Sequence, residues 1–245
     1  MFDILITIAE KDFNKLRFVE ESIENSIEGW NDIFIISPVA IPDERIYMSN
    51  QLFTDKDVLD FDFSRIKMES RRGWYRQQFI KLFQEVTADN YLVIDADAYI
   101  NKPLEINTAH PDFYLGKDQH HLPYFKFLKD VLNLDRVYPH SFIAEMMFFK
   151  RGVIKYILNE LKMDKQEFFN VAVDKINEID NGSGFSEYEM YGNYVTKNWP
   201  DFYGYKSIEV SHQWKKREWT DNEIRQYIEK YKNTNYNILT MHSWM

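Results

Sequence analysis

The chain has 245 residues, a formal net charge of -9, a hydrophobic fraction of 44% and no cysteine. This is enough apolar material for one sizeable core, so we expect a single α/β domain over residues 1–245. The negative charge repels polyanions, and nucleic acid is therefore excluded as an expected partner. Without cysteine there can be no disulfide, iron–sulfur cluster or thiolate zinc site, so any bound metal must have oxygen or imidazole ligands.

The apolar runs of the sequence are short. None approaches the roughly 18 apolar residues that a membrane-spanning helix needs, and the first strand-like run, residues 4–8, lies close to Met1. We therefore expect no transmembrane segment and no signal peptide, and a cytoplasmic location is the default expectation.

The first half of the chain alternates strand-like and helical patterns. Residues 4–8 form a β-rich run, and the apolar residues that follow recur at helical spacing, at Leu16, Val19, Ile23 and Ile27. Residues 33–36 and 91–94 are further strand-like runs. Such alternation predicts a mostly parallel sheet, whose ligands bind beyond the carboxyl ends of the strands. The predicted binding rim carries Ala9, Glu10, Ser37 and Asp95.

The second half continues the mixed pattern. Residues 142–149 predict another buried strand, and residues 153–161 have the apolar stripe of a helix. Residues 181–184, Asn-Gly-Ser-Gly, predict a flexible turn but are too few to separate two domains. Thr220 and Glu223 form a capping-box pattern that predicts a further helix. The tail after it is apolar enough to pack back onto the domain.

The strongest local motif is the pair Asp95 and Asp97, separated by Ala96, at the end of an apolar strand. Carboxylates placed together at a strand end suit Mg²⁺ or Mn²⁺. Such an ion can bridge the phosphate oxygens of a nucleotide and neutralise a departing diphosphate. The alternative is a solvated turn that ends the strand and binds nothing, because short motifs often arise by chance.

This motif resembles the DxD region of the GT-A glycosyltransferases. Residues 73–82 resemble the helix that precedes it in several of these families. Later features follow in the same order: a Ser-Phe-Ile strand, an acidic helix start and a late histidine, at residues 141–143, residues 186–189 and His242. The resemblance runs from Ile4 to His242. The chain departs from the pattern because it has no simple glycine-rich donor loop and carries Glu145 where a neutral residue is expected.

The resemblance implies a Rossmann-like GT-A fold, a mostly parallel twisted sheet flanked by helices. The donor-binding half would cover about residues 1–105 and the acceptor-binding half about residues 106–245. The implied activity is hexosyl or pentosyl transfer from a nucleotide sugar, expected to be a UDP- or GDP-sugar, to a glycan or other hydroxyl acceptor. The implied cofactor is Mn²⁺ or Mg²⁺, held by Asp95, Asp97 and His242. The implied nucleotide pocket comprises Thr7, Ala9, Glu10, Asp95 and Ala96.

The helix before the motif has a polar face. Arg72 and Arg76 are four residues apart, as are Gln77 and Lys81. Arginine suits bidentate contact with phosphate and glutamine suits sugar hydroxyls, so we predict donor contacts from Arg72, Arg76 and Gln77, with Arg76 preferred. The alternative is an ordinary amphipathic helix with solvated cations.

Inverting transfer requires a base that deprotonates the acceptor hydroxyl. Glu187 is our candidate because it lies near a helix start after a flexible turn, where inverting GT-A enzymes often present an acid; Glu189 is the second candidate. The structural alternative is a capping box of Ser186 with Glu189. Trp214 and Trp219 flank a basic run at residues 215–217, which predicts a further donor or acceptor contact, and Trp244 is predicted to close over the nucleotide.

Two other functions fit parts of the sequence. In phosphatases of the haloacid-dehalogenase type, a DxD like that of Asp95 and Asp97 supplies an aspartyl nucleophile and a neighbouring acid. That family opens its core with this strand, whereas about ninety residues precede it here, and Tyr99 replaces the usual small hydroxyl residue or valine. A non-catalytic carbohydrate-binding protein is the other alternative, for which an aromatic content of 17% is equally suitable.

Overall fold

The computed structural model describes residues 1–49, 51–115, 121–179 and 183–243. Its central sheet has the strand order β3-β2-β1-β4-β7. The strands are β1 (Phe2–Thr7), β2 (Trp30–Ser37), β3 (Gln51–Thr54), β4 (Asn90–Ile94) and β7 (Met146–Lys150). The first four are parallel, and β7 is antiparallel to β4 at one edge. The mostly parallel α/β sheet expected from the sequence is therefore confirmed.

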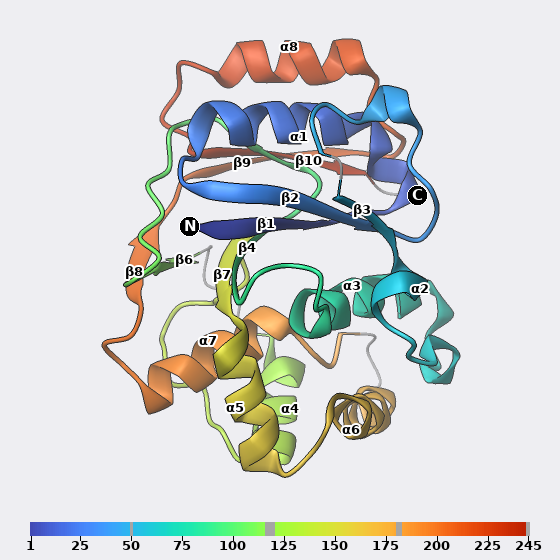
Figure 1. Ribbon diagram of the computed structural model, residues 1–245, viewed down its shortest axis with the longest axis vertical. Coiled ribbons are helices and arrows are strands. Elements are labelled where there is room, and N and C mark those ends of the chain that lie inside the picture. Colours follow the sequence, from blue (N-terminus) through green and yellow to red (C-terminus); the bar gives the residue numbers. More distant parts are fainter. Residues whose placement is uncertain (50, 116–120, 180–182, 244–245) are drawn as a thin grey trace.

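Helices lie on both sides of this sheet (Figure 1). On one side are α1 (Phe13–Ser26) and, outermost, α8 (Asp221–Tyr231). On the other side is a group made of α2 (Asp55–Val58), α3 (Arg72–Phe83), α4 (Leu122–Leu132), α5 (Arg151–Leu161), α6 (Lys165–Glu178) and α7 (Glu187–Asn198). Short 3-10 turns are η1 (Glu10–Asp12), η2 (Asp43–Arg45), η3 (Phe63–Arg65) and η4 (Glu69–Arg71). Of the helices in the described ranges, none has both the length and the apolar character needed to cross a bilayer.

A second sheet lies beside α1 and joins the middle of the chain to its C-terminal part. Its strands are β5 (Ala98–Ile100), β10 (Ile238–Ser243) and β9 (Val210–Lys215), with β10 in the middle, antiparallel to β5 and parallel to β9. A third pairing joins β6 (Asp112–Leu115) to β8 (Gly204–Ser207). Because β5 follows β4 almost directly, residues 95–97 form the turn between the two main sheets. The apolar tail does pack back, and it does so as β10.

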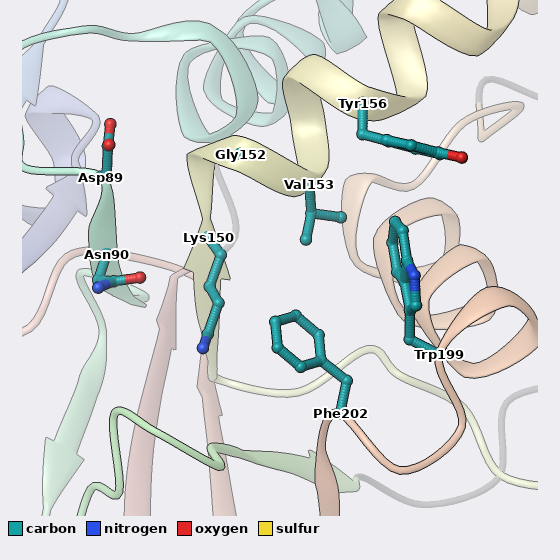
Figure 2. A pocket seen from close by; sticks show the side chains of 8 residues that line it. All are labelled: Asp89, Asn90, Lys150, Gly152, Val153, Tyr156, Trp199 and Phe202. Carbon is teal, nitrogen blue, oxygen red and sulfur yellow. The ribbon is translucent and has the colours of Figure 1, made fainter.

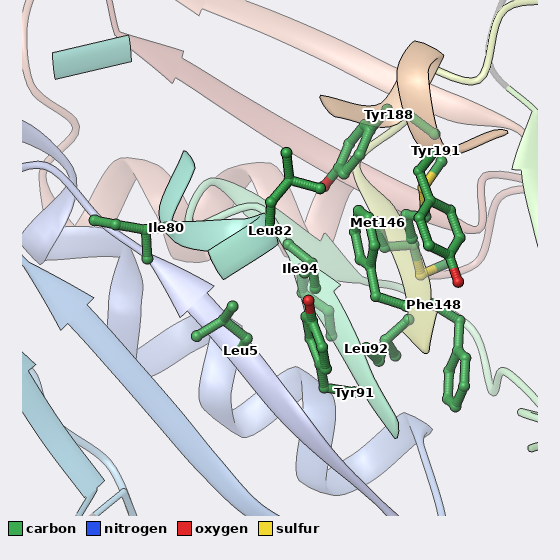
Figure 3. Packing of buried hydrophobic residues seen from close by; sticks show 14 of the residues in the cluster. Leu5, Ile80, Leu82, Tyr91, Leu92, Ile94, Met146, Phe148, Tyr188 and Tyr191 are labelled. Carbon is green, nitrogen blue, oxygen red and sulfur yellow. The ribbon is translucent and has the colours of Figure 1, made fainter. Parts of the chain in front are cut away.

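The core fixes β4 against α7. Leu92 and Ile94 of β4 are fully buried, as are Met146 and Phe148 of β7, and Tyr191 of α7 packs over them (Figure 3). Each such buried side chain contributes about 1.5–3 kcal/mol to folding. The acid pair after β4 and the acidic start of α7 therefore belong to one rigidly packed unit.

The buried strand predicted over residues 142–149 begins only at Met146; residues 141–145 are irregular. Glu189 captures their polar groups, accepting from the Ser141 hydroxyl at 2.6 Å and the Phe142 N–H at 3.3 Å. Phe142 is buried against Gly192, where an added Cβ would stand 2.2 Å from its ring. The apolar run is thus buried by α7 and not by strand pairing, so the prediction of a strand at residues 141–145 was wrong.

The predicted helix starts can also be compared with the structure. Thr220 and Glu223 form the complete capping box at the start of α8, which confirms that prediction. At α7, the Ser186 hydroxyl accepts from the Glu189 N–H at 3.3 Å. The reciprocal half of the box is missing because the Glu189 carboxylate binds Ser141 instead.

Candidate active site

The acid pair stands in a tight turn at the carboxyl end of β4. The Asp95 N–H donates to the Glu145 carbonyl at 2.9 Å, and the Ala98 N–H donates back to the Asp95 carbonyl at 3.0 Å. Ala96 is buried between the two acids. The side chains of Asp95 and Asp97 are only 35% and 21% exposed. Both carboxylates have defined partners, as described next, so this is not a solvated acidic turn.

Asp97 faces the second sheet. Its Oδ2 forms a hydrogen bond with Nδ1 of His242 at 2.9 Å, and its carbonyl accepts from the Met241 N–H at 2.9 Å. Burial raises the pKa of Asp97, but the hydrogen bond and charge of His242 outweigh burial and hold that pKa below its usual value. The other ring nitrogen of His242, Nε2, lies 3.1 Å from Nδ1 of His212, and the ring of Trp214 stacks on His242 at a centroid distance of 3.7 Å. This chain of contacts orients the His242 ring.

Asp95 faces the other way, toward α3 and α7. Lys81 of α3 places its Nζ 2.9 Å from Asp95 Oδ1, 3.1 Å from Glu187 Oε1 and 3.3 Å from the Tyr188 hydroxyl. Burial lowers the pKa of Lys81, but its neighbours, Asp95 foremost, raise that pKa well above the usual value. The buried ammonium therefore bridges the acid pair to the start of α7.

A cavity of about 140 Å³ opens beside this ammonium group. Helices α3 and α7 form most of its wall, and it is lined by Trp74, Gln77, Gln78, Lys81, Asp95, Tyr124, Ile143, Ala144, Ser186, Glu187 and Tyr188. With its amide nitrogen turned toward α7, Gln78 donates to Glu187 Oε2 at 3.1 Å and to the Phe185 carbonyl at 3.0 Å. The cavity is thus polar at one end, where it meets Asp95, and contains an orienting amide.

Negative charge is concentrated around Asp97. Burial, together with the nearby charges of Asp95 and Asp97, raises the pKa of Glu145 to about 7. Burial also raises the pKa of Asp12, against the opposing charge of Lys15. Carboxylates crowded in this way gain stability from a cation among them.

The donor set fits a divalent metal ion. In the described ranges, no three His, Asp or Glu side chains are already drawn together around a common point. However, Asp95 and Asp97 supply carboxylate oxygens and His242 supplies an imidazole nitrogen. Mn²⁺ binds both kinds of ligand, whereas Mg²⁺ prefers the oxygens. The chemistry of these groups and the surplus negative charge both suit such an ion.

The structure brings together some of the predicted site residues. Asp97 contacts His242 directly, and Glu187 is joined to Asp95 through Lys81. Gln77 lies in the cavity wall. The roles of these residues in metal binding, donor binding and catalysis stay predictions.

The two predicted donor arginines lie elsewhere on α3. Arg72 donates to the carbonyls of Ile66 and Ser64, each at 3.0 Å. Arg76 pairs with Asp55 at 3.1 Å. Neither lines the described cavity, because these residues face the segment before α3 and not α7.

The predicted residues after β1 reach the same rim without lining the cavity. Thr7 is buried at the end of β1, Ala9 precedes η1 and Glu10 is exposed. Their neighbour Lys11 donates to the Ser243 carbonyl at 2.9 Å, which ties this segment to the end of β10. A nucleotide contact by these residues therefore stays a prediction.

The two described tryptophans near the basic run differ in role. Trp219 is buried and donates from Nε1 to the His242 carbonyl at 3.1 Å, whereas Trp214 is half exposed over the His242 ring. Lys215 and Arg217 bind Glu223 of α8 at 2.7 and 2.9 Å. The predicted closure by Trp244 concerns a position outside the described residues.

Comparison with known proteins identifies the family of the chain. The sequence profile of a family of unknown function, DUF6492, matches residues 8–242. The chain belongs to the DUF6492 family. A search of curated proteins finds no match for this DUF6492 chain.

Among solved structures, the galactosyltransferase LgtC in complex with donor and acceptor sugar analogues is similar, with a TM-score of 0.50 and 10% identity. The alignment covers 97% of this chain and 86% of LgtC. Mouse xyloside xylosyltransferase 1, in its apo form, has a TM-score of 0.46 and 9% identity, with 98% and 97% of the two chains covered. The likeness to LgtC confirms the GT-A fold expected for this DUF6492 chain.

Several residues of the site were not singled out from the sequence. Lys81 was noted only for its helical spacing, and Glu145 only as a departure from the GT-A pattern. His212 was missed, although a local signal exists. The tripeptides His-Gln-Trp at residues 212–214 and His-Ser-Trp at residues 242–244 share the spacing H-x-W. The strands that carry them pair in parallel, with Trp214 opposite His242.

Proposed function

We propose that this protein is a glycosyltransferase that moves a sugar from a nucleotide-sugar donor to a hydroxyl acceptor with the help of Mn²⁺ or Mg²⁺. One observation carries the proposal. The Lys81 ammonium binds both Asp95 of the DxD turn and Glu187, which lies in the wall of a cavity. The second acid of the turn, Asp97, is bonded to His242. This arrangement stands at the carboxyl end of a parallel strand, where ligands bind in such sheets.

The metal would be held by Asp95, Asp97 and His242. When bound, it would supply positive charge that stabilises the departing diphosphate. The protein's own part is to prepare these ligands. Asp97 Oδ2 and His242 Nδ1 lie 2.9 Å apart, so these two side chains are already neighbours.

The donor sugar would enter the cavity between α3 and α7. Gln77 in its wall offers amide contacts to hydroxyl groups. Lys81 is held in place by the carboxylates of Asp95 and Glu187. A UDP- or GDP-sugar is the proposed donor, carrying a hexose or a pentose, and a glycan or another hydroxyl compound is the proposed acceptor.

Glu187 is the proposed base. It would accept the proton of the acceptor hydroxyl while that oxygen bonds to the anomeric carbon, and the bond to the diphosphate would break with its electron pair leaving on the nucleotide. Lys81 and Gln78 hold the two carboxylate oxygens at 3.1 Å each. Both oxygens are therefore already in contact with the protein, and one of these contacts must be given up for that oxygen to reach an acceptor hydroxyl.

The first test is a thermal-shift screen with UDP-, GDP-, CDP- and dTDP-sugars, each with and without Mn²⁺. A donor that binds the native state raises the melting temperature by mass action, and the proposal requires the increase to depend on metal. The positive donor is then incubated with candidate acceptors, and released nucleoside diphosphate is measured. Free phosphate from a generic phosphoester, without diphosphate release, would favour a phosphatase. Glycan binding without any turnover would favour a carbohydrate-binding protein.

The stereochemistry is read from the product. Proton NMR of the anomeric signal distinguishes inversion from retention directly. A product with the donor's anomeric configuration would remove the base role from Glu187, because retention needs no such base there, while the proposed metal site would stand.

A further inference from the structure

A second cavity, of about 490 Å³, lies at the other end of the β4–β7 pair (Figure 2). It is bordered by Asn90 and Lys150, which face each other in the strand register. The proposed active site begins after Ile94, four residues along β4, or about 13 Å away at 3.3 Å per residue. This cavity stands at the amino end of β4 and is therefore separate from the proposed donor and metal site.

Aromatic rings form one side of the cavity. Trp199 at the end of α7 contacts Tyr156 of α5 at a centroid distance of 5.1 Å and Phe202 at 6.2 Å. Both contacts are edge-on, with interplanar angles of 70° and 63°, so none of these rings covers another face to face. Tyr156 is 45% exposed. Exposed ring faces beside a cavity suit a ligand with a flat apolar face.

The opposite side offers polar donors. The Lys150 ammonium lies 4.4 Å from the centre of the Phe202 ring, and within the described ranges it has no hydrogen bond or ion pair. Partial burial lowers the pKa of Lys150, as expected for an ammonium that is desolvated without a counter-ion. The Asn90 amide likewise makes no hydrogen bond to a described residue, and in Figure 2 it extends toward Lys150.

The nearest acid does not neutralise this lysine. Asp89 points away from Lys150 in Figure 2, and its carboxylate lies 3.6 Å from Nε of Arg151. The cavity therefore combines an ammonium group and an amide that have no ion pair or hydrogen bond to a described residue with aromatic rings that do not stack face to face on one another.

We propose that this cavity binds an acidic saccharide, with the pyranose ring against Trp199 and Phe202 and the sugar carboxylate at Lys150. The amide of Asn90 would contact a hydroxyl group. A single carboxylate matches a single ammonium, whereas a phosphate of higher charge is disfavoured by the exposed Asp89 and the net charge of -9. This binding site goes beyond the proposed transfer reaction and does not depend on it.

The test compares two ligands on the full chain. Methyl β-glucuronide and methyl β-glucoside are titrated by ligand-observed NMR, since they differ only in the carboxylate. We expect the glucuronide to bind about fivefold more tightly, the contribution of a partly exposed ion pair. The variant Lys150→Gln should remove this preference and leave the weaker neutral binding.

A second variant blocks the cavity without removing a contact. Gly152 lies in α5 on the cavity wall, and a Cβ added there meets no atom within 4 Å. The variant Gly152→Leu therefore fills open space, replaces a poor helix former and should abolish binding of both glycosides. Its melting temperature and its response to nucleotide sugars serve as controls for folding and for the proposed active site.

Four outcomes would overturn the proposal. The two glycosides could bind with equal affinity, or neither could bind. Binding could survive Gly152→Leu. Adenosine monophosphate could bind more tightly than the glucuronide, which would assign the cavity to a nucleotide. Each is independent of glycosyl transfer, so failure here and failure of the proposed function are distinguishable.

Discussion

A lysine lies at each end of β4, Lys81 of α3 at one and Lys150 of β7 at the other, and the two differ in their surroundings. At the carboxyl end, Lys81 is 9% exposed in its side chain and bound to two carboxylates and a tyrosine hydroxyl. At the amino end, Lys150 is partly buried against one aromatic ring and has no described counter-ion. A buried lysine with all its partners in place is part of the protein's own architecture. A lysine that lines a cavity and has no described ion pair can bind an anionic group of a ligand. The contrast separates an ion-pair network inside the protein from a cavity whose lysine has no ion pair to a described residue.

The largest effect should come from the acid pair itself. Asp97→Ala removes a proposed metal ligand and the hydrogen-bond partner of His242, so we expect kcat/KM for transfer to fall by about 10³-fold or more. Steady-state assays over a range of Mn²⁺ concentrations measure this. Asp89→Ala, an acid 82% exposed at the other end of β4, is the matched control and should behave as the wild type. A near-normal rate and retained metal dependence in Asp97→Ala would reject the metal assignment.

The next effect concerns stability. Lys81→Met leaves the buried Glu187 and the partly exposed Asp95 without their cation, and breaking a buried ion pair such as Lys81–Glu187 from one side costs about 3–5 kcal/mol. Urea unfolding should show a decrease of this size in the free energy of unfolding. A loss below about 1 kcal/mol would mean that the network is solvated, and the contrast between the two lysines would then weaken.

Glu187→Gln tests the chemistry more narrowly. The amide keeps the shape of the side chain but cannot take up a proton, so we expect kcat to fall by about 100-fold with little change in donor affinity. Single-turnover kinetics with a saturating donor measure the chemical step. Glu189→Gln is the comparison for the second candidate, although its carboxylate already binds Ser141 at 2.6 Å. Wild-type turnover in Glu187→Gln would end its candidacy as the base.

A smaller effect compares adjacent residues of α3. Gln77 lines the cavity, whereas Arg76 is bound to Asp55, so Gln77→Ala should raise the donor KM by about fivefold, the loss of one hydrogen bond. Arg76→Ala should change the donor KM by less than about twofold. A larger increase in donor KM for Arg76→Ala than for Gln77→Ala would support Arg76 as the donor contact, as the sequence favours.

The smallest effect should be that of Lys150→Met. Removing an unpaired ammonium breaks no ion pair in the described structure, so the free energy of unfolding should change by no more than about 0.5 kcal/mol. Transfer activity should also be unchanged. A loss as large as that of Lys81→Met would show that Lys150 has a structural role, and the two ends of β4 would then be alike.

The sequence was most informative where function follows from local order along the chain. The strand-end rule alone placed Asp95 at the binding rim, whereas the helix before the motif and the late histidine were expected from the resemblance to the GT-A glycosyltransferases. The positions of Arg76 and Gln77 could not be predicted in this way. Adjacent helical residues point about 100° apart, and only the packing of α3 decides which of them faces α7.

Long-range pairing explains the remaining differences. Lys81 and Glu187 are bonded across more than a hundred residues of chain, and no periodicity reveals such a contact. The segment before β7 has the apolar pattern of a strand. However, the Glu189 carboxylate accepts hydrogen bonds from Ser141 and Phe142, and Gly192 leaves space for the Phe142 ring. In both cases the deciding partner lies on α7, and its position depends on the docking of helices.

The placement of β10 has a consequence for the order in which the molecule is built during translation. The chain is synthesised from its N-terminus, and β1 to β4, the DxD turn and α3 all precede β10. Asp97 meets its histidine only when β10 inserts between β5 and β9, strands that have no contact with each other in the sheet before then. The acid pair is therefore synthesised well before His242, the side chain to which Asp97 bonds.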